Sequence, residues 1–243
     1  MDTMQNRAGA NFKLMKQIII KNGSILTLTL MVFMSCAEKR DLRGTLTFIL
    51  SSNVRAQFDP CGWKKNPLGG LPRKSTYIRE TREQGKDPII LDAGEVLFTS
   101  PLVLDNTRSA DEYKAKNIVK GYEDIGCDAI NIGGYDLAGG VKFLKEIMDS
   151  TEIPFISANL KDKSTGKLFS DPYVIIDRHP FKIGVIGLTN LLKEDNQHIV
   201  MDDIYSAGKR YIRELKSKAD FIIMMVNADK NEKKAIQDEF SDA

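Results

Sequence analysis

The sequence predicts an α/β fold that contains a mixed β-sheet. Apolar strand-like runs alternate with amphipathic helical patterns from residue 45 onward, and this alternation is typical of layered α/β proteins. The strand-like runs 172–178 and 181–189 are joined only through Arg178-His179-Pro180. Because this link is too short for a crossover helix, the two runs must form an antiparallel hairpin within the sheet.

Each strand is predicted from a run rich in β-branched and aromatic residues that is bounded by Gly, Pro, Asn, Asp or Ser. These runs are residues 45–52, 87–94, 128–134, 154–160, 172–178, 181–189 and 219–227. Between them, apolar residues recurring at helical spacing predict helices. These cover residues 72–84, 109–125, 139–149, 204–216 and 231–240. No strand-like run follows the last helical pattern, so we expect a domain that is truncated at its C-terminus.

Residues 15–36 have the layout of a secretory signal peptide. Lys16 and Lys21 precede an uncharged apolar stretch at 24–34, which is shorter than the roughly 20 residues of a membrane-spanning helix. Cys36 follows Ser35 as in a bacterial lipobox, where the cysteine carries the lipid of the mature protein. The alternative is a plain signal peptide with a cysteine near it by chance. We expect residues 1–14 to be an upstream extension and residues 45–243 to be the folded domain.

The balance of charges argues against a nucleic-acid partner, and the cysteines raise the question of a disulfide. The chain has 35 basic and 33 acidic residues, which gives no broad basic surface for nucleic acid. Export would place Cys61 and Cys127 in an oxidising compartment, where they could pair. The alternative for Cys127, at the start of a predicted strand, is a small buried side chain.

Several short motifs, in their order and spacing, resemble the N-terminal domain of the bacterial 5'-nucleotidase branch of the calcineurin-like metallophosphoesterases. They are Ser52-Asn53, Gly69-Gly70-Leu71, Leu91-Asp92-Ala93-Gly94, Asn131-Ile132-Gly133, Ser157-Ala158-Asn159-Leu160, Ser164-Thr165-Gly166 and the run from Ile183 to Thr189. The resemblance implies a sandwich of two mixed β-sheets flanked by helices. It also implies that strand ends converge on a site for two divalent metal ions.

At most of the implied ligand positions this sequence has another residue. In the first motif Asn53 is kept, but Val54 stands at the aspartate and Ala56 at the histidine. Glu95 takes the place of the aspartate that bridges both metals.

The remaining motifs are altered as well. In the third, Gly134 stands at the asparagine and Tyr135 at the histidine, with Asp136 after them. Asn227 stands at the histidine of the fourth, and the last motif would lie beyond Ala243. His179 and His198, the two histidines of the chain, fall at no ligand position.

These replacements favour a non-hydrolytic protein without catalytic residues. The signal-like residues 15–36 favour an exported lipoprotein that is held at the membrane by a lipid on Cys36. We expect Glu95 and Asp136 to be vestigial metal ligands that hold at most one weakly bound divalent cation. A phosphate-containing small molecule or a protein is the expected partner.

Two other functions remain open. One is an active phosphoester hydrolase with the rearranged ligands Asp92, Glu95, Asp136 and Asp229. The other, more distant, is thiol or metal handling by Cys61.

Overall fold

The computed structural model describes residues 41–60, 69–192 and 197–241. The described residues from Leu42 onward belong to one compact unit. The predicted upstream extension, signal peptide and lipobox lie outside the described residues. No helix in the described ranges is both long enough and apolar enough to span a membrane.

The first sheet has four parallel strands in the order β1-β2-β3-β4. Parallel neighbours need crossover connections, and helices supply them here. The strands and the intervening helices are β1 (Phe48–Ser51), α2 (Leu71–Glu83), β2 (Ile89–Asp92), α3 (Arg108–Asp124), β3 (Ala129–Asn131), the 3₁₀ helix η1 (Gly134–Leu137), α4 (Val141–Asp149) and β4 (Phe155–Ile156).

The second sheet has the order β6-β7-β9 and is mixed. Strands β6 (Tyr173–Arg178) and β7 (Phe181–Thr189) form the antiparallel hairpin predicted from the short link between them, whereas β9 (Phe221–Asn227) runs parallel to β7. Helix α5 (Ile204–Leu215) connects toward β9, and α6 (Lys233–Phe240) follows it. The side chain of Asp203 caps α5 by accepting from the N–H of Ser206 at 2.8 Å.

The run 154–160, predicted as one strand, is divided between two elements. After β4 the chain leaves the first sheet, because the N–H of Ser157 donates to the carbonyl of Asp171 and that of Ala158 donates to the carbonyl of Gly187 in β7 of the second sheet. It then forms β5 (Leu160–Asp162), which pairs with β8 (Ile199–Met201) in a small antiparallel sheet. The sequence did not predict this third sheet.

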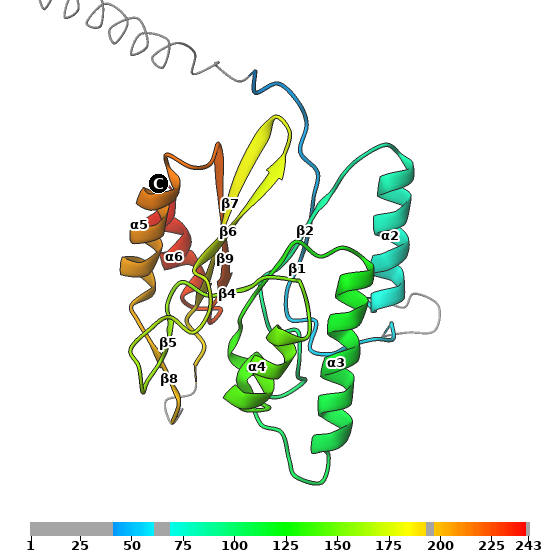
Figure 1. Cartoon of the computed structure of the whole chain (residues 1–243), viewed down its shortest axis with the longest axis vertical. Coiled ribbons are helices and arrows are strands. Elements are labelled where there is room, and N and C mark those ends of the chain that lie inside the picture. The colour runs from blue at the N-terminus through cyan, green and yellow to red at the C-terminus, as the bar shows by residue number, and fades with distance from the viewer. Residues whose placement is uncertain (1–40, 61–68, 193–196, 242–243) are drawn as a thin grey trace, which may run out of the picture. The chain divides into compact units, whose positions relative to one another are not determined.

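The two main sheets pack face to face, and helices cover their outer faces (Figure 1). Ile89 and Leu91 of β2 meet Ile183 and Val185 of β7 between the sheets. Alternate residues point outward, as a strand requires: Ile90 packs under α3, and the outward residues of β7 pack under α5. The α/β sandwich that the resemblance implied is confirmed, with strands parallel throughout the first sheet and mixed in the second.

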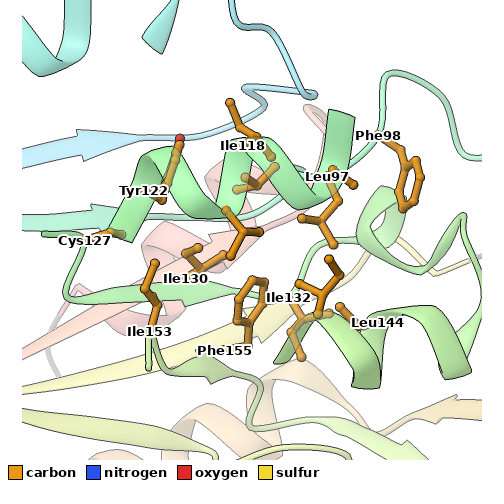
Figure 2. Close-up of a cluster of buried hydrophobic side chains, with 14 of the residues drawn as sticks. Leu97, Phe98, Ile118, Tyr122, Cys127, Ile130, Ile132, Leu144, Ile153 and Phe155 are labelled. Atoms are coloured by element: carbon orange, nitrogen blue, oxygen red, sulfur yellow. The ribbon is translucent and has the colours of Figure 1, made fainter. Parts of the chain in front are cut away.

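The largest buried cluster lies between the first sheet and α2, α3 and α4 (Figure 2). Leu97 and Phe98, which follow β2, point into it together with side chains from α3, β3 and α4. The loop that leaves β2 is therefore anchored by its own apolar residues, which fixes the position of Glu95 just ahead of them.

Candidate functional site

The carboxyl ends of β1, β2, β3, β7 and β9 meet at one place. A Cβ atom added at Gly133, just after β3, would lie 3.0 Å from Cγ of Glu95 and 3.2 Å from Cγ of Asn227. The N–H of Gly134 donates to Oδ1 of Asn227 at 3.2 Å. The strand ends thus converge as the resemblance implied. We call residues 53–56, 94–97, 133–136, 190–191 and 227 the strand-end site.

A buried amide and a close approach of the two sheets hold this edge together. Nδ2 of Asn131 donates to the carbonyl of Ala93 at 3.1 Å and to that of Leu188 at 2.9 Å, and so links the loop after β2 to β7. A Cβ at Gly187 would lie 2.5 Å from Oδ1 of Asn131. Only glycine at residue 187 leaves room for this cross-sheet link.

The loop after β1 supplies hydrocarbon where the family motif has ligands. Val54 packs against the main buried cluster, and Ala56 is buried with 8% of its surface exposed. Neither side chain has a lone pair to offer a metal. Asn53 keeps the family's residue type, and its position is fixed by its backbone N–H, which donates to the carbonyl of Gly94 at 2.9 Å.

Left-handed backbone at non-glycine residues is concentrated in this site. In the part of the chain that the structure describes, such residues are Asn53, Arg55, Ala56 and Glu95, with φ between 52° and 60°. Each such residue costs of order 1–3 kcal/mol, and strain of this kind clusters at functional sites. Hydrogen bonds hold it, including N–H of Arg55 to the carbonyl of Glu95 at 2.8 Å.

Glu95, at the bridging position, is paired with an arginine. Its carboxylate is 2% exposed and accepts from Arg55 through Nε at 3.0 Å and Nη2 at 2.7 Å. The guanidinium of Arg55 also lies over the ring of Tyr135, 4.6 Å from its centroid. The side chains of three neighbouring loops are thereby joined around one built-in positive charge.

Asp136 is buried and its carboxylate is surrounded by backbone donors. Oδ1 accepts from the N–H groups of Val96 and Leu97, both at 2.8 Å, and Oδ2 accepts from Glu95 at 2.9 Å and Gly133 at 2.8 Å. Burial raises the pKa of Asp136 to about 7, while the N–H donors of Leu97, Gly133 and Glu95 oppose that rise. With both oxygens occupied in this way, Asp136 braces the loop after β2 against η1.

No room exists for a side chain at residue 134. The space that a Cβ on Gly134 would take is filled by the main-chain carbonyl of Leu191, in the loop after β7. An asparagine ligand at this position would therefore collide with backbone. The replacement at residue 134 is built into the packing of the site.

The residues present do not fit a two-metal centre. Val54, Ala56 and Gly134 provide no ligand atoms, Glu95 faces Arg55, and Asp136 faces four backbone N–H groups. Across the described ranges, no group of three or more His, Cys, Asp or Glu side chains is placed to hold a metal ion.

The four carboxylates considered as rearranged ligands have separate surroundings. Asp92 accepts from Ser51 at 2.5 Å and from Tyr122 at 2.7 Å. Asp229 is exposed and accepts from the N–H of Asn231 at 2.8 Å. Together with the contacts of Glu95 and Asp136, these bonds give each carboxylate partners within the protein.

A buried ionic cluster that sequence reasoning missed lies beside the site. Nζ of Lys74 is 4.0 Å from Oδ2 of Asp92 and donates to Ser51 at 2.7 Å, over the ring of Tyr122. Burial lowers the pKa of Lys74 and raises the pKa of Asp92. This cluster ties α2 and α3 to the ends of β1 and β2.

The sequence analysis also missed Arg55. Arg55 lies between Val54 and Ala56, the two positions at which ligands are replaced. The signal available in the sequence was its positive charge beside these positions, and in the structure this charge faces the carboxylate of Glu95.

Two of the cysteine predictions, Cys36 and Cys61, lie outside the described residues. Cys127 is a buried free thiol that donates to the carbonyls of Ile90 and Ala129, both at 3.5 Å. Burial raises its pKa to about 12. Its alternative interpretation, a small buried side chain, is confirmed.

Known proteins share both the sequence and the fold. A 2',3'-cyclic-nucleotide 2'-phosphodiesterase/3'-nucleotidase of Yersinia enterocolitica is 26% identical over 204 residues, which cover 76% of this chain and 31% of that protein. A 5'-nucleotidase of Vibrio cholerae is 30% identical over 170 residues, covering 65% of this chain and 30% of that protein. The chain thus spans about a third of the length of these relatives. No family model matches the sequence.

Among solved structures, a 5'-nucleotidase precursor of Thermus thermophilus superposes with a TM-score of 0.66 at 19% identity, over 77% of this chain and 38% of that one. The NAD nucleotidase of Haemophilus influenzae gives a TM-score of 0.65 at 17% identity, over 79% and 35%. These structures show that the fold is that of the metallophosphoesterase sandwich. In sequence the chain is similar to these nucleotidases and phosphodiesterases, and in fold it is similar to the 5'-nucleotidase branch of the calcineurin-like metallophosphoesterases.

Proposed function

We propose that this chain is a non-hydrolytic member of the 5'-nucleotidase branch, which binds a ligand or partner without cleaving a phosphoester. The observation that carries the proposal is the packing of the Leu191 carbonyl into the side-chain space of Gly134. A ligand lost in this way cannot be replaced by a small shift of a neighbouring side chain. The hydrocarbon side chains of Val54 and Ala56 support the same conclusion for the first motif.

The energetics of the reaction make these losses decisive. Two-metal hydrolysis uses both ions to activate water and to neutralise the leaving oxygen. Losing either contribution removes several kcal/mol of transition-state stabilisation, and each 1.36 kcal/mol is about tenfold in rate. In this chain the altered positions belong to several motifs, so turnover is expected to be absent rather than slow.

Activity is tested directly with the purified chain. Nucleoside monophosphates, 2',3'-cyclic nucleotides and an aryl phosphate are incubated with Mn²⁺, Zn²⁺ or Mg²⁺, beside a Glu95→Ala variant prepared in the same way. We expect equal background release of phosphate from both proteins. Turnover that required both added metal and Glu95 would overturn the proposal and favour a hydrolase.

The ligand class is proposed from the exposed part of the site. The Arg55 side chain is 44% exposed although it is paired with Glu95, so a phosphate-containing small molecule or an acidic surface of a protein has access to it. Titration calorimetry with inorganic phosphate and AMP tests the small-molecule case. Binding that is equal in wild type and Arg55→Ala would exclude Arg55 as the contact.

We further propose that the chain is exported and held at the cell envelope by a lipid on Cys36. The proposal rests on the signal-like layout of residues 15–36 and on Ser35-Cys36. A single acyl chain binds membranes only marginally, whereas several chains hold a protein firmly. Cells are grown with a fatty-acid analogue, and Cys36→Ser is compared with Cys61→Ser. Label and membrane attachment should be lost only in Cys36→Ser, and a Cys36→Ser protein that stays labelled and membrane-bound would refute it.

A further inference from the structure

The strand-end site contains a buried negative charge that requires a partner. Glu95 has 2% of its side chain exposed, and a carboxylate removed from water is costly unless a counter-charge or hydrogen-bond donors surround it. The resemblance assigns this counter-charge to metal ions. The residues of this chain do not fit those ions, so the charge of Glu95 must be balanced by the protein itself.

Arg55 meets this requirement through both its backbone and its side chain. Its N–H donates to the carbonyl of Glu95 at 2.8 Å, and Nε and Nη2 donate to Oε2 of Glu95 at 3.0 and 2.7 Å. The left-handed backbone at Arg55 and Glu95, with φ of 53° and 60°, makes this approach possible. A strained backbone at both partners indicates that the pairing is specified by the loops and is not an incidental surface contact.

The edge of the guanidinium contacts Glu95, and one of its faces is covered by the ring of Tyr135. The ring centroid lies 4.6 Å from Cζ of Arg55, within the range of a cation–π interaction. Arg55 and Glu95 come from the loops after β1 and β2, and Tyr135 comes from η1, which follows β3; these three segments carry the first three metal motifs of the family. One guanidinium therefore connects the same three segments that metal ions would connect.

We infer that Arg55 is a built-in cation that replaces a metal ion at Glu95: it neutralises the carboxylate, ties the three segments together and keeps divalent cations out. This goes beyond the proposed function, because a non-hydrolytic protein could still depend on a bound metal. Here the fold is metal-independent. Removing Arg55 exposes Glu95 to added cations.

The test combines thermal melting with Mn²⁺ binding measured by electron paramagnetic resonance. Wild type is compared with Arg55→Ala, with Arg55→Lys and with the double variant Arg55→Ala/Glu95→Gln. Arg79→Ala is the matched control, since Arg79 forms an exposed pair with Glu83 in which both side chains are about two-thirds exposed (67% and 66%). Each protein is melted in EDTA and in Mn²⁺.

Wild type and Arg79→Ala should melt at the same temperature in both solutions and bind no Mn²⁺. Arg55→Ala should melt about 2–8 °C lower in EDTA, regain part of this loss in Mn²⁺, and bind Mn²⁺. Arg55→Lys should fall between them, because an ammonium cannot reproduce the two guanidinium contacts. The double variant should recover stability in EDTA without responding to Mn²⁺, since its buried side chain is neutral.

Wild-type protein that binds Mn²⁺ as tightly as Arg55→Ala would overturn the inference, as would an Arg55→Ala variant that melts like wild type. Neither result depends on catalysis. A wild type that binds Mn²⁺ but releases no phosphate would therefore refute the built-in cation and leave the non-hydrolytic proposal intact. Phosphate release by a wild type that binds no Mn²⁺ would refute the non-hydrolytic proposal alone.

Discussion

Gly134 and Leu191 pack directly together, with the carbonyl of Leu191 in the space that a side chain on Gly134 would need. Gly134 follows β3 and Leu191 follows β7, so this contact joins the two sheets at their carboxyl ends. It also means that the loop after β7 is positioned by the absence of a side chain at residue 134.

Gly134→Ala should destabilise the fold, because the obstacle is backbone that cannot rotate away. Overpacking of this kind costs about 1–3 kcal/mol, which appears as a lower urea midpoint at unchanged slope. Gly121→Ala in α3 is the control. Its neighbour is the flexible end of the Leu71 side chain, and alanine is the better helix former by about 1 kcal/mol. Equal losses in both variants would contradict the packing argument.

Asp136→Asn should also be destabilising. The amide places an NH₂ group opposite two backbone N–H donors that the carboxylate now accepts. Burying unsatisfied donors costs about 1–3 kcal/mol each. The exposed Asp149 offers the matched control Asp149→Asn, which should change the free energy of unfolding by less than about 0.5 kcal/mol. Equal stability of Asp136→Asn and wild type in urea would exclude the bracing role.

Asn159→Ala should weaken the contact between the end of the first sheet and β7. The Asn159 side chain donates to the carbonyl of Thr189 at 2.7 Å and accepts from its N–H at 3.0 Å. Both backbone groups are buried, so removing their partner should cost about 2–3 kcal/mol. Asn117, whose amide bonds within its own helix near the surface, provides the control Asn117→Ala. Hydrogen exchange of the Thr189 amide should accelerate only in Asn159→Ala.

Cys127 should be unreactive in the folded protein. Burial raises the pKa of its thiol to about 12 from an ordinary value of 9.0, and only the thiolate reacts with alkylating reagents. Mass spectrometry of the Cys127 peptide after iodoacetamide treatment at mildly alkaline pH should show labelling in urea and none without it. Rapid labelling of the native protein would contradict the burial.

The raised pKa of Cys127 also makes the free energy of unfolding depend on pH. Because the folded pKa of Cys127 lies above the unfolded value, the contribution of the neutral thiol is complete below about pH 9 and is lost as the pH rises toward 12. Alkaline unfolding of a Cys127→Ala variant should therefore depend less on pH in that window.

The elements that were predicted correctly are specified by local sequence, either by their own residue pattern or by the length of an adjoining turn. Strand β7 agrees with the predicted run 181–189, and its hairpin with β6 follows from the length of one turn. The failure at 154–160 has a different origin. Its strand-like run from 154 to 160 contains no turn signal, but the chain changes sheets at Ser157 because of hydrogen-bond partners more than ten residues away. No local pattern encodes those partners.

Some features of the candidate site were likewise predictable from local sequence, and others were not. Order and spacing of the motifs were sufficient to predict that Glu95 and Asn227 approach each other. The role of Arg55 depends on left-handed backbone at two separate loops, and the space at Gly134 depends on Leu191, which is far away in sequence. Substituted ligand positions are visible in a sequence, whereas the groups that fill the resulting space appear only in the fold.

For the non-hydrolytic protein proposed above, the Leu191 carbonyl beside Gly134 also makes a return to a metal centre difficult. Changing Val54, Ala56 or Glu95 back to the family residues would each be a single step, and none of these steps would restore a site. An asparagine at residue 134 would first require the main chain around Leu191 to take another path. A return to a hydrolase therefore requires a rearrangement of the loop at Leu191 that by itself brings no catalytic gain. Without that rearrangement, restoring any single ligand brings no benefit.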